Sequence, residues 1–114
     1  MYVNAFCCAV PNANKEAYIR HASIFAEIIR AQGCQRYTEC WGDDIPDGET
    51  TSFTKAVQAR DNESIVLGWA EWRSKEDCEK GMAAAMQDER MRDMEMPFDG
   101  KRLIFGSFNS IIEV

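Results

Sequence analysis

Four carboxylates lie close together in one short segment of the chain, namely Asp43, Asp44, Asp47 and Glu49. Oxygen ligands at this density suggest a site for a hard cation such as Ca²⁺. The spacing does not match an EF-hand loop, because Pro46 and a short turn interrupt it. Aspartate side chains in turns commonly bond to the nearby backbone instead. We therefore expect a solvated loop and no metal site.

A pair of basic residues, Lys101 and Arg102, follows a Pro-Phe-Asp-Gly turn. Strand alternation would send the two side chains to opposite faces, so one of them would point inward. A buried cation needs an anionic ligand or a carboxylate partner, such as Asp44, Asp47 or Asp99. We predict that Asp44 and Arg102 bind a ligand; an ion pair that joins the two loops is the alternative.

Two tryptophans, Trp41 and Trp69, are the other predicted ligand-binding residues, because an indole offers a large flat surface and one hydrogen-bond donor. Core packing explains both residues equally well. Cys40 has no His, Lys or Arg beside it in the sequence to lower its pKa, so we interpret it as a packing residue. The five cysteines lack C-x-x-C spacing and histidine partners, which excludes the usual zinc and redox motifs.

His21 is the only histidine of the chain, and it lies at the border of the apolar stripe of a predicted helix. Its ordinary pKa suits a general base. We favour a partly exposed helix residue without a chemical role. The residue types therefore define no catalytic group, and we expect no cofactor.

The composition excludes several classes of protein. A net charge of −6, with scattered basic residues, argues against nucleic-acid binding. The apolar runs are too short for a membrane span, and the N-terminal segment alternates like a strand rather than like a signal peptide. An odd number of cysteines without an export signal indicates reduced thiols. We expect a cytoplasmic protein that begins at or near Met1.

The hydrophobic pattern predicts one α+β domain over residues 1–114, with an antiparallel ferredoxin-like sheet and two main helices on one face. An extra strand or hairpin arm is expected at residues 51–60, which alternate in the same way as the strands. The second helix either breaks near Asp88 or continues to about Met94. The predicted strands cover 2–10, 34–41, 64–72 and 101–113, and the predicted helices begin at residues 15 and 74.

The central strands are apolar on both faces. In the strand that begins at Ser64, Leu67 and Trp69 alternate with Val66 and Ala70. Two helices can cover only one face of the sheet, and the other would expose more apolar surface than the roughly 300–600 Å² patch of a typical monomer. A homodimer in which two sheets face each other would cover it.

Several blocks carry a resemblance that extends over most of the chain: Glu39-Cys-Trp41, Asp44-Ile-Pro-Asp-Gly48, Arg90-Met91 and the run from Met96 to Gly106. With these blocks the chain resembles the YbaA-like family of small bacterial proteins. The resemblance implies a ferredoxin-like protomer of the dimeric α/β-barrel group. It supplies no catalytic residues, because the family has no established activity.

The predicted function is that of a homodimeric module that binds a small molecule or a protein and has no evident catalytic constellation. The alternative rests on analogy with the wider barrel group. It is a cofactor-independent, monooxygenase-like enzyme with a pocket between the sheet and the helices.

Overall fold

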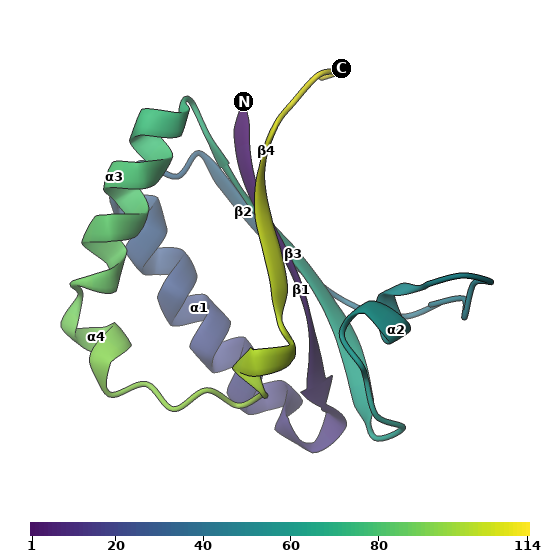
Figure 1. Ribbon diagram of the computed structural model, residues 1–114. Helices are drawn as coiled ribbons and strands as arrows, with labels where there is room; N and C mark the ends of the chain where they lie inside the picture. The colour runs from purple at the N-terminus through teal and green to yellow at the C-terminus, as the bar shows by residue number, and fades with distance from the viewer.

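The computed structural model describes residues 1–114 and has the α+β architecture that the pattern predicts (Figure 1). Two long helices, α1 and α3, lie together on one face of a four-stranded sheet. Two shorter helices, α2 and α4, and two 3₁₀ turns complete the chain. The elements are β1 (Tyr2–Pro11), η1 (Asn12–Asn14), α1 (Lys15–Ala31), β2 (Arg36–Trp41), α2 (Phe53–Ala56), β3 (Glu63–Trp72), α3 (Lys75–Met86), α4 (Glu89–Arg92), η2 (Gly100–Arg102) and β4 (Ile104–Asn109).

The sheet has the strand order β2-β3-β1-β4, and every neighbouring pair is antiparallel. The two long strands β1 and β3 occupy the centre, which agrees with their continuous apolar sequence. This order confirms the predicted ferredoxin-like fold. The sheet of the single chain is open and is not closed into a barrel.

Side-chain caps define where the later helices begin. The Ser74 hydroxyl accepts a hydrogen bond of 3.1 Å from the Asp77 amide at the start of α3. The Asp88 carboxylate accepts one of 2.9 Å from the Arg90 amide, so a new helix, α4, begins there and the chain does not continue α3. Of the two alternatives for this segment, the break at Asp88 is the correct one. None of the helices is long and apolar enough to cross a lipid bilayer.

The extra strand expected at residues 51–60 does not form, and this prediction was wrong. Ser52 caps a short helix there, because its hydroxyl accepts a 3.0 Å hydrogen bond from the Lys55 amide. Val57 then points inward and is fully buried, and Gln58 ends the helix with a φ of 51°. The strand-like alternation of residues 51–60 was too short to outweigh the N-cap at Ser52 and the burial of Val57.

The last strand is shorter than predicted. Residues 101–113 were expected to alternate throughout, but β4 covers only Ile104–Asn109. Asp99 caps the preceding turn, where its carboxylate accepts a 3.0 Å hydrogen bond from the Lys101 amide. Lys101 and Arg102 therefore belong to the turn η2 and not to a strand.

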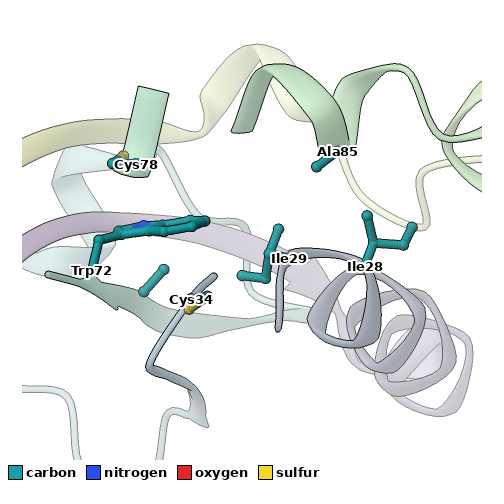
Figure 2. Packing of buried hydrophobic residues seen from close by; sticks show 7 residues of the cluster. Ile28, Ile29, Cys34, Trp72, Cys78 and Ala85 are labelled. Carbon is teal, nitrogen blue, oxygen red and sulfur yellow. The ribbon is translucent and has the colours of Figure 1, made fainter. Parts of the chain in front are cut away.

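The main core lies between the sheet and the helices, around Trp72 (Figure 2). The indole lies between Cys78 of α3 and Cys34, and its Nε1 donates a 2.9 Å hydrogen bond to Asn4 Oδ1. Gly81 makes this arrangement sterically feasible, because a Cβ atom there would come within 2.4 Å of the indole ring. The closely packed indole thus fixes the distance between α3 and the sheet.

The opposite face of the sheet is only partly covered. At one end of this face Val57, which directly follows α2, forms a small buried cluster with Cys7, Ala9 and Ile65. Beyond this cluster, the rows that pair across the sheet expose Leu67 and Ile104 beside Cys7, and Phe108 beside Val3. We call this surface, made of Val3, Ala5, Leu67, Trp69, Ile104 and Phe108, the open face.

Candidate ligand-binding cavity

A cavity of about 460 Å³ lies on the helix-covered side of the sheet. Its walls come from all four strands, from α1 and α3, and from the segment between α3 and η2. In Figure 1 this segment runs below α4 and returns to the sheet at η2. The volume falls within the range of small-molecule sites in proteins, about 300–1,000 Å³.

Most of the wall is apolar, and fourteen of the nineteen lining residues are hydrophobic. Aromatic rings form much of this surface; Tyr18 stacks on Phe98 with ring centroids 5.5 Å apart, and Phe25 meets Tyr37 edge-on at 5.7 Å. Four of the six methionines supply flexible thioethers on the α4 side, namely Met82, Met91, Met94 and Met96. Such a wall favours an apolar, flat molecule.

The only acidic group in the wall is the carboxyl group of Glu39, on β2. Glu39 pairs with Gly68 on β3, and the absence of a side chain at Gly68 leaves room for the ring of Phe6. The hydroxyl of Tyr18 donates to Glu39 Oε1, and the hydroxyl of Tyr37 donates to Oε2 at 2.5 Å. One carboxylate therefore receives two phenol donors, one from α1 and one from its own strand.

The protonation of this cluster is set mainly by burial. Burial raises the pKa of the Glu39 carboxyl group above its ordinary value, and the two tyrosine hydrogen bonds oppose that rise. Burial, followed by the interaction with Glu39, raises the pKa of Tyr18 and Tyr37 well above their ordinary values. Both phenols therefore keep their protons and act as donors at neutral pH.

Three further polar residues line the cavity. Asn4 and Ser107 are occupied with each other, since Asn4 Nδ2 donates a 2.8 Å hydrogen bond to Ser107 Oγ. The ring of His21 lies near the rings of Tyr18 and Phe98, with centroids 6.3 and 6.2 Å away. Burial lowers the pKa of His21 below its ordinary value, so this ring is neutral at neutral pH.

The two predicted tryptophans lie on opposite faces of the sheet, so they cannot contact one ligand in the same chain. Trp41 packs against the buried cluster that contains Tyr18 and Val66 on the helix side, and Lys15 Nζ lies 5.0 Å from the centre of its ring. Trp69 pairs with Ala5 and Thr38 on the open face. Neither tryptophan lines the cavity. Ligand binding at Trp41 or Trp69 stays a prediction.

Asp44 and Arg102 are also separate from the cavity. Asp44 is exposed, and nowhere in the chain do three His, Cys, Asp or Glu side chains gather as a metal site would require. Arg102 binds Glu63 through two hydrogen bonds of 2.7 Å and Asp99 through one of 3.1 Å. Asp99 was an expected partner, whereas Glu63 was not. A ligand role for Asp44 or Arg102 likewise stays a prediction.

The sequence contained one signal for the cavity that was not used. In β2, strand alternation places Tyr37, Glu39 and Trp41 on the same face, so Glu39 lies between two aromatic side chains. A carboxylate on the buried face of a strand is rare unless it is paired, and it is therefore informative. Its partner Tyr18 lies on α1, so only the fold brings the two groups together.

The fold and the cavity together define an α+β ferredoxin-like protein with a ligand-sized, acid-containing cavity between sheet and helices. A family model described as a protein of unknown function, DUF1428, matches residues 1–100. The chain belongs to this family.

Relatives and a solved structure agree with this assignment. The chain is 44% identical over 114 residues to the uncharacterized protein YbaA of Escherichia coli K12, covering 98% of this chain and 97% of the relative. The YbaA protein of Shigella flexneri matches to the same extent. A crystal structure described as a dimeric ferredoxin-like protein from an uncultured marine organism superposes with a TM-score of 0.59 at 10% identity, over 99% of this chain and 98% of that one. The last likeness concerns the fold alone.

Proposed function

We propose that the protein is a homodimer that binds a small, largely apolar molecule in the Glu39 cavity. The observation that carries this proposal is the composition of the wall, in which one carboxylate with two phenol donors lies within an otherwise mostly hydrophobic surface. Ligand sites commonly combine an apolar wall with a few polar groups that fix orientation.

The open face supports the dimer. Phe108 is 58% exposed and Ile104 is 46% exposed, although both extend from a strand that pairs with the centre of the sheet. Such a patch is best covered by the same patch on a second copy of the chain, because a two-fold contact needs only one self-complementary surface. The fold neighbour is itself described as dimeric. We also place the protein in the cytoplasm, where its five free thiols would stay reduced.

Proton transfer in the same cavity is the second candidate function. Glu39, with a raised pKa, and neutral His21 both line the cavity, and proton transfer requires groups of this kind within reach of a bound substrate. A bound molecule whose mass changed during incubation would favour this candidate over binding alone.

Native mass spectrometry of untagged protein taken gently from cell extract tests the main proposal. We expect a mass near twice 13.0 kDa plus one small organic molecule per chain. As a matched comparison, Ala22→Phe would place a ring in the cavity wall, and this variant should lose the extra mass while staying dimeric. A clean monomer at micromolar concentration would contradict the dimer, and an extra mass that Ala22→Phe retains would contradict the cavity.

A further inference from the structure

Glu39 is a partly buried carboxylate that lacks a cation. None of the ion pairs of the chain includes it. Its polar partners in the fold are the two phenols of Tyr18 and Tyr37, which are neutral donors. Each carboxylate oxygen retains acceptor capacity beyond the one bond that it receives.

A second buried carboxylate in the same protein shows the contrast. The side chain of Glu63 is 3% exposed, and Arg102 neutralises it through two hydrogen bonds of 2.7 Å. This is the ordinary arrangement, because a desolvated charge is costly unless it is paired. Glu63 thus has its counter-ion within the chain, whereas Glu39 has none.

The rest of the cavity also lacks positive charge. No lysine or arginine is among the lining residues. The groups that titrate in the wall are Glu39, Tyr18, Tyr37 and His21, and the last three are neutral at neutral pH. An anionic ligand would therefore meet a carboxylate and no compensating cation. A cationic ligand would gain a charge-assisted bond and the faces of several aromatic rings.

We infer that the cavity selects a cationic amine: a molecule with a flat or aliphatic apolar body and one protonated nitrogen that binds the Glu39 carboxylate. The inference rests on the proposed function, since it specifies the ligand of the same cavity. Tyr18 and Tyr37 act as positioning residues, because they hold the two carboxylate oxygens in place. The rings of Phe6 and Phe98 contact the apolar body.

Three commercially available indoles with a similar skeleton and different charge test this inference: tryptamine (cation), tryptophol (neutral) and indoleacetate (anion). Calorimetric titration of the wild-type protein at neutral pH should show tryptamine binding at least about tenfold more tightly than tryptophol, as one charged hydrogen bond allows. Indoleacetate should bind most weakly. Equal affinity for tryptamine and tryptophol would overturn the amine inference and leave cavity binding intact.

Substitutions then assign the preference to one residue. Glu39→Gln keeps the shape of the side chain and should reduce tryptamine affinity about tenfold, with a smaller change for tryptophol. Tyr37→Phe keeps the carboxylate and should retain the preference. Glu16→Gln removes an exposed charge of α1 and should change nothing. A preference that survives in folded Glu39→Gln would overturn the inference. If none of the three indoles shifts the NMR signals of the methionine methyl groups that line the cavity, the proposed function fails as well.

Discussion

Replacing Arg102 by methionine should lower the free energy of unfolding by about 1–3 kcal/mol, the cost of leaving the hydrogen-bonded carboxylate of Glu63 without its partner. Arg102 is 12% exposed and contacts Glu63, Asp99 and the carbonyl oxygen of Gln58. It therefore joins the turn before β4 to the start of β3 and to the end of α2. Urea unfolding at a fixed protein concentration measures the loss.

The neighbouring variant Lys101→Met is the matched control. Lys101 is exposed and forms no ion pair, so the free energy of unfolding of this variant should stay within about 0.5 kcal/mol of the wild-type value. The double variant Arg102→Met with Glu63→Gln should recover part of the lost stability, because no unpaired charge remains. An Arg102→Met protein as stable as Lys101→Met would show that the ion pair contributes nothing.

The pH dependence of the stability of these variants follows from the pKa of the Glu63 carboxyl group. The bonds from Arg102 lower the pKa of Glu63 from 4.5 to about 2. Since the folded-state pKa lies below the unfolded value, the contribution is fully present above pH 4.5 and is lost as the pH falls toward 2. The stability gap between wild type and Arg102→Met should therefore narrow over this pH range.

Introducing aspartate at position 108 should raise the dissociation constant of the homodimer at least about 30-fold, equivalent to a loss of roughly 2 kcal/mol or more at an interface centre. Phe108 lies on the open face, paired with Val3, and is 58% exposed in the single chain. The change should cost the isolated fold little, whereas a dimer would have to bury the new charge. Analytical ultracentrifugation across a dilution series measures the effect.

The same substitution at Phe105 provides the control on the same strand. Phe105 pairs with Phe6, lines the cavity side of the sheet and is 82% exposed. Phe105→Asp should therefore leave dimerisation unchanged and weaken ligand binding instead. The opposite result, in which only Phe105→Asp dissociates the dimer, would place the dimer contact on the cavity side of the sheet and would contradict a contact through the open face.

Local signals in the sequence were sufficient for most of the fold. The apolar runs of β1 and β3 and the Ser74 cap are each features of a few consecutive residues, so they can be recognised without tertiary context. The segment 51–60 failed because strand-like alternation competed there with the Ser52 cap. What decided the outcome was the burial of Val57 in a cluster with Ile65 and with Cys7, and Cys7 is distant in sequence.

The site was harder to predict than the fold, because its groups converge only in three dimensions. Tyr18 comes from α1 and Glu39 from β2, and nothing in the spacing of the two residues indicates a hydrogen bond. The residue type of Trp41 and Trp69 suggested ligand binding, yet their strands direct the two side chains to opposite faces of the sheet. His21 was interpreted as a residue without a chemical role, and it lies in the cavity wall.

Methionine methyl NMR gives the most direct test that the Glu39 cavity binds a small molecule. The chain has six methionines: Met82, Met91, Met94 and Met96 line the cavity, whereas Met1 and Met86 do not. With methyl-labelled methionine, titration of tryptamine and tryptophol should shift the four cavity signals in a saturable way and leave the other two in place. Saturable shifts confined to Met1 or Met86, or no shift at any methionine, would contradict binding in this cavity.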